Sequence, residues 1–234
     1  MTLPKLLHPT FEIEIPSTKQ KIRYRPFLVK EEKILLIAQQ SNDPQDMIFA
    51  IKQVLQNCAI DQLDVESLTT FDIEYFFIKL RSKSINNIVT LRYKDLEDEK
   101  VYDFEVDLEE IEVEYNNDHE NNVQINDSTI LVLKYPKVSM LSAIKSENNT
   151  DFVFAVLRQC LDKLLHGKEE FSFDNESDQD IDEFILSLDV KAFNKVQSFL
   201  DTMPKLRHTI TYTNSLGNER KIVLENLEDF FTLG

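Results

Sequence analysis

The chain has 234 residues, of which 42% are hydrophobic and 29% are charged. That length and that share of apolar residues allow a buried core, in one large domain or in two small ones. The only glycines are Gly167, Gly217 and Gly234, so the chain lacks the glycine-rich loops with which common nucleotide-binding proteins hold phosphate. The composition therefore predicts a folded protein without such a loop.

The net charge of −16 is unevenly distributed along the chain. Residues 95 to 120 contain thirteen acids against Lys100 alone, and residues 169 to 183 contain eight acids and no base, so the two stretches together carry −20. Nucleic acid is not an expected partner, because binding phosphates requires a basic surface. Acidic runs are typical of solvated loops and strand edges, and the alternative is a docking site for a basic partner.

Neither a membrane segment nor a disulfide is expected. Residues 1 to 16 contain no apolar run followed by small residues, and no window is apolar over the length that a bilayer requires. We therefore expect no membrane contact and a protein that stays in the compartment where it is made. Cys58 and Cys160 lie in apolar helical patterns, where a reduced thiol packs as a small hydrophobic side chain.

The first half of the chain alternates between strand and helix patterns. Alternation of apolar and polar residues predicts an opening β-hairpin and, after three helices, a second hairpin around a charged turn. Asp43 followed by Pro44 is a typical helix start. The third helix, from Thr70 to Ser82, is apolar on nearly every side, which places it in the core. The apolar residues of the first helix are Ile34, Leu35, Ile37 and Ala38. The expected elements are strands 10–15 and 21–27, helices 30–40, 43–58 and 70–82, and strands 88–93 and 101–106.

The second half repeats this order of elements after a polar stretch that lacks apolar periodicity. An apolar stripe from Ile181 to Leu200 predicts helix, which Asp189 can interrupt. Gly217 can adopt the positive φ of a hairpin turn. The chain ends with Leu227, Phe230 and Phe231, a cluster that packs on its own domain or anchors a neighbour. The expected elements are strand 129–135, helices 138–145 and 151–165, a linker-like acidic loop 167–179, a helical region from 180, and strands 208–212 and 220–224.

The sequence thus predicts an α+β fold of helices and antiparallel β-hairpins in two topologically similar halves. The repeat gains support from V-L-x-x-C, which occurs at corresponding helical positions in the two halves, at Val54 to Cys58 and at Val156 to Cys160. The late hairpins also correspond, with L-R-Y at residues 91 to 93 beside I-T-Y at 210 to 212. Few identities are involved, and chance matching is the alternative. We expect an N-terminal half at 1–115, a linker at 116–128 and a C-terminal half at 129–234.

No group of residues predicts catalysis or a metal site. Asp103, Glu105 and Asp107 place three carboxylates on one strand face, but the segment lacks the turn and the glycine of calcium loops. No serine lies in a G-x-S-x-G turn, and the 42 acids do not select a catalytic pair. We therefore expect no enzymatic activity, no cofactor and no metal. The histidines are far apart, and none has a second His or Cys at metal-binding spacing: His8, His119, His166 and His208.

Two segments of the first half resemble a known family. The first runs from Arg23 to Lys33 as R-Y-R-P-F-L-V-K-E-E-K and continues into I-L-L-I-A. The second, from Phe71 to Ser84, is F-D-I-E-Y-F-F-I-K-L-R-S-K-S. In order and spacing these segments resemble the baseplate hub assembly proteins of T-even-type tailed phages. The resemblance is firmest over residues 20 to 115 and weaker in the C-terminal half.

This resemblance implies a non-enzymatic tail protein that acts in assembly of the baseplate central hub in the cytoplasm of the infected host. The alternative is a permanent structural subunit of the hub in the virion. In both cases the implied partners are other baseplate hub or tail proteins. Tyr24, Arg25 and Phe27 are candidates for partner contacts, because aromatic and arginine residues are frequent binding hot spots. The alternative is that they only support the turn at Pro26.

Some relatives carry cysteine pairs in the turns of the late hairpins. This chain has no cysteine at residues 94 to 100 or at residues 214 to 218. We therefore expect turn residues, rather than a zinc ion, to hold these hairpins.

Overall fold

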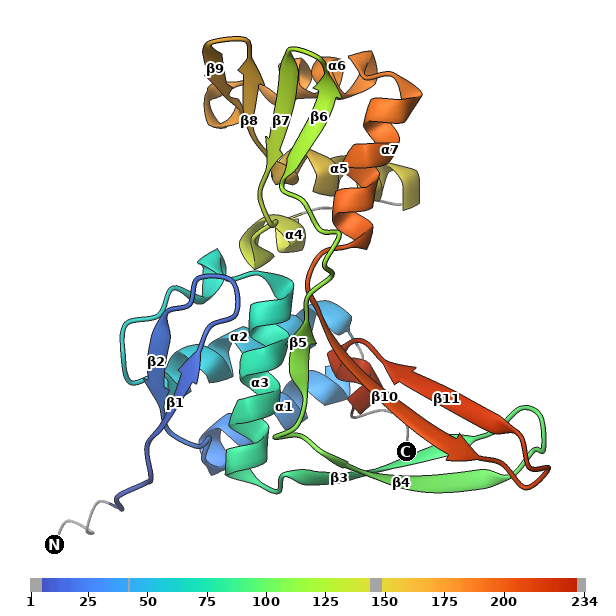
Figure 1. Cartoon of the computed structure of the whole chain (residues 1–234). Helices are drawn as coiled ribbons and strands as arrows, with labels where there is room; N and C mark the ends of the chain where they lie inside the picture. The colour runs from blue at the N-terminus through green and yellow to red at the C-terminus, as the bar shows by residue number, and fades with distance from the viewer. Residues whose placement is uncertain (1–5, 42, 144–148, 231–234) are drawn as a thin grey trace, which may run out of the picture. The chain divides into compact units, whose positions relative to one another are not determined.

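The computed structural model describes residues 6–41, 43–143 and 149–230, and Figure 1 shows the course of the chain. The chain forms two compact units. Unit 1 comprises Met1–Glu114 and Lys205–Gly234, and unit 2 comprises Tyr115–Pro204. Unit 2 is therefore an insertion within the chain of unit 1.

Unit 1 begins with a hairpin that is followed by three helices. In the hairpin, β1 (Phe11–Glu14) pairs antiparallel with β2 (Lys21–Tyr24). The third helix presents buried residues on several sides, among them Phe76 and Ile78, so its predicted place in the core is confirmed. The helices are α1 (Val29–Ser41), α2 (Pro44–Cys58) and α3 (Thr70–Ser84), with the short 3₁₀ helix η1 (Val65–Ser67) before α3.

Side chains that accept hydrogen bonds from the backbone define where these helices begin. The Asp43 carboxylate accepts from the Gln45 N–H at 2.9 Å, as the predicted helix start requires. At α3, the Thr69 hydroxyl accepts from the Asp72 N–H while the buried Asp72 carboxylate accepts from the Thr69 N–H. Asp72 also accepts from the N–H and the hydroxyl of Ser17 at 2.9 and 2.6 Å. The first hairpin turn is thereby attached to α3.

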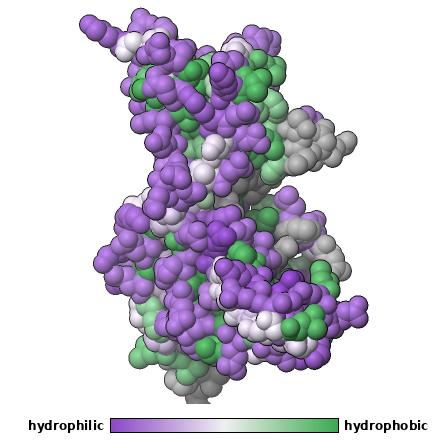
Figure 2. Space-filling model, turned by 45° about the vertical axis from the view of Figure 1, so that its right-hand side comes forward, coloured by the Kyte–Doolittle hydropathy of each residue, from purple (hydrophilic) through white to green (hydrophobic). Residues whose placement is uncertain are grey.

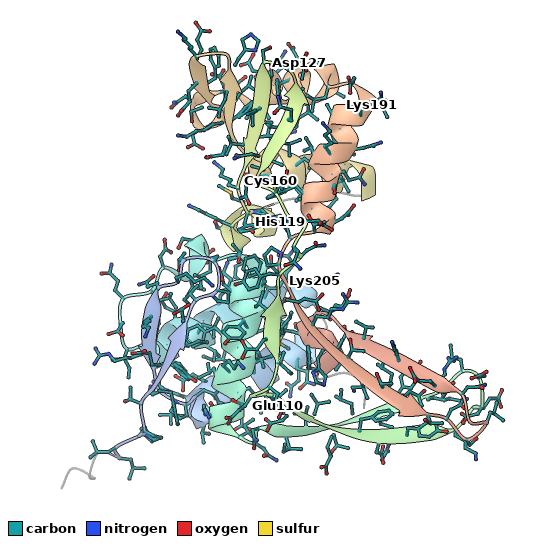
Figure 3. All side chains as sticks on the ribbon, in the orientation of Figure 1. Glu110, His119, Asp127, Cys160, Lys191 and Lys205 are labelled. Atoms are coloured by element: carbon teal, nitrogen blue, oxygen red, sulfur yellow. The ribbon has the colours of Figure 1, made fainter. Side chains whose placement is uncertain are left out.

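Two long hairpins complete unit 1. In the first, β3 (Ile88–Lys94) pairs with β4 (Val101–Asp107). In the second, β10 (Lys205–Thr213) pairs with β11 (Glu219–Leu224), and β10 also pairs with β5 (Glu112–Glu114). The Lys205–Glu114 pair therefore joins the two chain segments that flank unit 2, and Lys205 is labelled in Figure 3.

The 3₁₀ helix η3 (Leu227–Phe230) follows the last strand of unit 1. Phe230 is buried in it. Burial, together with the nearby carboxylate of Asp229, raises the pKa of Glu74 on α3 to about 7. The last turn of the described chain thus brings an acidic residue next to a partly buried carboxyl group of the central helix.

Unit 2 is a four-stranded antiparallel sheet that packs against helices. The strand order is β6-β7-β8-β9. Buried residues of the sheet and the helices, such as Leu131, Leu157 and Phe199, form its core. Asp189 starts the last helix by accepting from the Ala192 N–H at 2.8 Å, so the expected interruption at Asp189 is present. The strands are β6 (Asn122–Asn126), β7 (Thr129–Leu133), β8 (Leu161–His166) and β9 (Glu169–Ser172). The helices are α4 (Val138–Ala143), α5 (Asn149–Cys160), η2 (Phe173–Asn175), α6 (Asp178–Ser187) and α7 (Val190–Asp201).

Part of the order of elements recurs in the two units, namely a hairpin, two helices, a 3₁₀ helix and a further helix, with equivalent hydrogen bonds. The Cys58 carbonyl at the end of α2 accepts from the Arg25 N–H at 3.0 Å, and the Cys160 carbonyl at the end of α5 accepts from the Lys134 N–H at 2.8 Å. In unit 1 the 3₁₀ helix follows α2 without another helix or strand between, whereas in unit 2 the strands β8 and β9 come between α5 and the 3₁₀ helix. In both units the 3₁₀ helix is followed by one further residue and a residue with a capping hydroxyl group, and then by the next helix. The V-L-x-x-C match therefore marks two equivalent helix ends.

The compact units differ from the two expected halves. The sequence interpretation assigns all of 129–234 to the C-terminal half, whereas Lys205–Gly234 belongs to unit 1. The reason is long-range pairing. The second late hairpin joins β5 and bonds to the first late hairpin, through residues as far as 121 positions apart in the chain. Local patterns carry no signal for such contacts.

Several local predictions also differ from the structure. The expected linker 116–128 contains β6, and the expected loop 167–179 contains β9 and η2. The helix expected over 151–165 ends at Cys160, where β8 begins. The β8 segment L-D-K-L-L-H lacks β-branched and aromatic residues, so pairing with β7 overrides its weak strand propensity. The helix expected over 138–145 is present over Val138–Ala143, and the last two residues of that prediction lie outside the described residues.

Candidate functional site

Helix α1 carries apolar residues that remain accessible to solvent. None of the four consecutive apolar residues from Ile34 to Ile37 is buried, and the buried residues of this helix are Glu31 and Ala38. Leu36 is 51% exposed and Ile37 is 58% exposed. The sequence interpretation counts Ile34, Leu35, Ile37 and Ala38 as the apolar side of this helix, yet only Ala38 is buried. Grouped apolar side chains at a surface are typical of protein-binding sites.

A groove of about 540 Å³ lies beside α1 within unit 1. Phe77 of α3 and Leu91 of β3 line it and are themselves buried, and Phe230 of η3 also contributes. Leu36 of α1 and Ile85 belong to the same lining but are exposed. The groove therefore offers an apolar base with accessible apolar edges, which can accept apolar side chains of another protein.

Two charged residues line the same groove, Glu32 of α1 and Arg81 of α3. Burial lowers the pKa of the Arg81 guanidinium from its ordinary value. A partly desolvated arginine among apolar side chains is a frequent anchor for a partner protein. Of the predicted terminal cluster, Phe230 takes part in the groove, and Phe231 lies outside the described residues.

A buried ion pair fixes the start of α1. The fully buried Glu31 carboxylate accepts from Arg25 Nη2 at 3.0 Å and from the Leu28 N–H at 2.9 Å. Arg25 also donates to the Asn57 carbonyl at the end of α2 at 3.0 Å. Burial alone would favour the neutral acid, but the hydrogen bonds from Arg25 and Leu28 outweigh it, and the pKa of Glu31 is lowered. Arg25 thus connects the first turn of α1, the helix that carries the exposed side chains, to the end of α2.

The three candidate contact residues near Pro26 have structural roles. Tyr24 is buried, its ring lies 5.3 Å from that of Phe76, and burial raises its pKa to about 12. Phe27 is buried as well, and Arg25 holds Glu31. The interpretation that these residues support the turn agrees with their burial and hydrogen bonds. Leu36 and Ile37 of the following helix are accessible instead. The sequence carries no signal that separates these two residues from the other apolar residues of α1, because only the packing of the helix exposes them.

The turns of the two late hairpins meet within unit 1. The Tyr212 hydroxyl donates to the fully buried Asp95 carboxylate at 2.6 Å, and Arg220 Nε lies 3.5 Å from the same carboxylate. The hydrogen bond from Tyr212 is the main reason that the pKa of Asp95 is lowered. The Tyr212 ring also lies 5.0 Å from the rings of Tyr102 and Phe104. Aromatic packing thus surrounds a hydrogen-bonded acid at this junction.

Further carboxylates of the first turn bond to the second turn. Glu97 accepts from the side-chain amides of Asn214 and Asn218 at 2.7 and 2.8 Å. Asp98 accepts from the N–H and the hydroxyl of Ser215 at 2.9 and 2.8 Å. Turn residues therefore hold these hairpins, as predicted, and they do so by joining one hairpin to the other.

Two of the four histidines form hydrogen bonds with hydroxyl groups. His119, labelled in Figure 3, stacks on Tyr135 at 5.5 Å and bonds through Nδ1 to the Thr202 hydroxyl at 2.9 Å. Burial lowers the pKa of His119. His166 bonds to the Thr129 hydroxyl at 2.8 Å. Among residues 6–41, 43–143 and 149–230, no three His, Cys, Asp or Glu side chains group in a way that could hold a metal ion.

The carboxylates of β4 and the two cysteines are likewise part of the fold. Asp103 pairs with Arg92 at 2.9 Å across the hairpin. Cys58 and Cys160 are buried free thiols, as their apolar helical positions predict. Burial raises the pKa of Cys58 to about 11 and that of Cys160 to about 12, so neither is a reactive thiolate.

Hydrophobic residues form small groups in a largely hydrophilic surface on the face shown in Figure 2. No helix in the part of the chain that the structure describes is long and apolar enough to cross a membrane. The exposed apolar residues of α1 and the adjoining groove are the main candidate for a functional site, because accessible apolar side chains beside an apolar groove are suited to contact with another protein.

Comparison with known protein families gives a match over nearly the whole chain. The protein family described as T4 bacteriophage base plate protein matches residues 8–232, nearly the whole chain. No curated protein and no solved structure matches. The family match extends through both compact units and through the late hairpins.

Proposed function

Since the chain belongs to the T4 bacteriophage base plate protein family, we propose that it acts in assembly of the central hub of the phage tail baseplate. Family membership makes it a phage baseplate protein that associates with other baseplate proteins. The proposal adds that it works without enzymatic chemistry, through contacts with hub proteins in the cytoplasm of the infected host.

The accessible apolar residues of α1 carry this proposal. Leu36 borders a groove that has an apolar base, and the Arg25–Glu31 ion pair holds the first turn of the helix. We therefore assign α1 and the groove as the docking site for another baseplate protein, whose apolar side chains would enter the groove. A stable interface of ordinary size buries about 800 Å² on each partner, so neighbouring surface residues must take part.

The distribution of charge supports a protein partner rather than a nucleic acid. Unit 2 contains 8 basic and 16 acidic residues, which leaves a net charge of −8, and the same net charge remains for unit 1 out of the total of −16. Both units would repel phosphate. We accordingly propose no contact with nucleic acid and no contact with a membrane.

The experiment compares two double variants in infected cells. Leu36→Ser with Ile37→Ser removes the accessible apolar side chains of α1. Leu186→Ser with Val190→Ser is the matched control, because it also removes two exposed apolar residues, but in unit 2. Tagged protein is recovered from the lysate, and hub proteins are quantified by mass spectrometry. We expect wild type and control to capture hub proteins in similar amounts. The amount captured by the α1 variant should be at least about tenfold lower.

Equal capture by both variants would remove α1 from the site, and no capture of hub proteins by wild type would reject the assembly role. The alternative is a permanent structural subunit of the hub. Quantitative mass spectrometry of purified tails separates the two, because a permanent subunit is present there at a fixed ratio to the hub proteins. An assembly factor is absent from tails or far below that ratio.

A further inference from the structure

Unit 2 contains a small groove of its own, where β8, β9, η2 and α6 meet. Its volume is about 200 Å³. The buried side chain of Ile181 lines it, together with Phe173 and Phe184, whose ring centroids lie 5.1 Å apart. Phe171 of β9 lines it too and is 48% exposed. The groove is therefore mainly apolar, has three phenylalanines in its lining, and is accessible to an apolar side chain from outside.

Acidic residues border this groove. Glu176 and Asp180 belong to its lining, and both are exposed. They are part of the run from 169 to 183, which has eight acids and no base. Half of these acids already have a cation: Glu170 pairs with Lys163, Asp174 with Lys134, and Asp178 and Asp182 with Arg158. For the other half, no ion pair forms within the described ranges of the chain: Glu169, Glu176, Asp180 and Glu183.

Acidic residues also line a second groove of unit 2, so they do not by themselves distinguish the groove beside Phe171. That groove, of about 380 Å³, is lined by Asp118 and Glu120. Lys195 lies in the same lining and donates to the Gln124 carbonyl at 2.7 Å, and most of its other lining residues are polar. The charged lining residues of this groove therefore sum to −1, and its apolar lining residues are Val123 and Phe199. The lining of the groove beside Phe171 has two acids and no base, and it has five apolar residues, three of them phenylalanines.

We infer that the groove beside Phe171 binds a basic protein segment, in which an apolar side chain is flanked by lysines or arginines. The apolar side chain enters the groove and covers Phe171, and the cations pair with Glu176 and Asp180. Burial of aromatic surface supplies affinity, while the complementary charge supplies specificity and fast association. The site shares no residue with the α1 groove and belongs to the other unit. The inference therefore goes beyond the proposed function, and an experiment can refute one of the two without refuting the other.

The full-length protein is titrated into two fluorescein-labelled synthetic peptides. One has a single phenylalanine among lysines, and the other has serine in its place. Binding is followed by fluorescence anisotropy at low and at physiological salt. We expect wild type to bind the phenylalanine peptide about five- to tenfold more tightly than the serine peptide. The affinity should fall as salt is added, because the charges at the groove edge are exposed.

Two variants test the two parts of the site. Phe171→Ala should remove the preference for phenylalanine and leave binding of the serine peptide unchanged. Glu176→Gln with Asp180→Asn should weaken binding of the phenylalanine peptide about three- to tenfold. The matched control is Glu110→Gln with Asp127→Asn, which changes the net charge equally outside the groove; both residues are labelled in Figure 3. It should bind like wild type.

Three results would overturn the inference. They are equal affinity of wild type for the two peptides, equal weakening by the control variant, and unchanged binding by the variant of Glu176 and Asp180. Far-UV circular dichroism confirms that each variant is folded. If Phe171→Ala does not fold, the charge variant and its control still decide the outcome, because their substitutions keep side-chain size.

Discussion

The buried pair of Arg25 and Glu31 allows a quantitative test of how α1 is held. Arg25→Met keeps most of the apolar stem but removes the guanidinium that donates to Glu31 at 3.0 Å and to the Asn57 carbonyl at 3.0 Å. Glu31 is fully buried and would retain the Leu28 N–H as its main donor. Removing one partner of a buried pair costs about 3–5 kcal/mol. We expect about 3 kcal/mol here, because Arg25 keeps some contact with solvent.

The double variant Arg25→Met with Glu31→Leu serves as the control. It removes both charges, so no unpaired carboxylate is left in the interior, and most of the lost stability should return. Stability is measured by urea unfolding, followed by far-UV circular dichroism because the chain contains no tryptophan. A loss below about 1 kcal/mol for Arg25→Met, or a double variant as unstable as the single one, would refute the reasoning.

The pH dependence of this pair follows from the lowered pKa of Glu31. A carboxylate whose pKa is lower in the folded state contributes stability above its unfolded pKa of about 4.3. That contribution is lost as the pH falls through the folded pKa. The difference between wild type and Arg25→Met should therefore be largest near neutral pH and become smaller below about pH 4.

Three further predictions concern other buried or partly buried groups. Glu74 has a pKa of about 7 in the folded protein. Its neutral form therefore contributes stability that is present at acidic pH and lost as the pH rises through 7. In urea unfolding at pH 8, Glu74→Gln should be more stable than wild type by about 1–2 kcal/mol, and equal stability would contradict this. Tyr212→Phe removes the hydrogen bond to buried Asp95, and calorimetry should show a loss of about 1–2 kcal/mol. Cys58 and Cys160, with pKa values of about 11 and about 12, should react with a thiol reagent only in denaturant, so rapid labelling of the native protein would contradict their burial.

The sequence determined those features of this protein that depend on neighbours in the chain. Alternating residues identify the hairpins, and apolar spacing with Asp43 before Pro44 identifies α2 and its start. The apolar character of Thr70–Ser84 places α3 in the core. These signals are local, because hydrogen bonds and side-chain spacing within a helix or a hairpin involve residues only a few positions apart. The family resemblance carried by two segments of this region also required no tertiary structure.

Only the tertiary structure decided which hairpins meet and which side of α1 is free. The contact of Tyr212 with Asp95 spans 117 positions and depends on how β10 passes beside β5. Residues 34 to 37 of α1 are all apolar, so periodicity alone cannot show which of them face the core. Packing against α2 and burial of Glu31 orient the helix, and this leaves Leu36 and Ile37 exposed. The candidate binding surface thus follows from tertiary packing, which no short sequence pattern encodes.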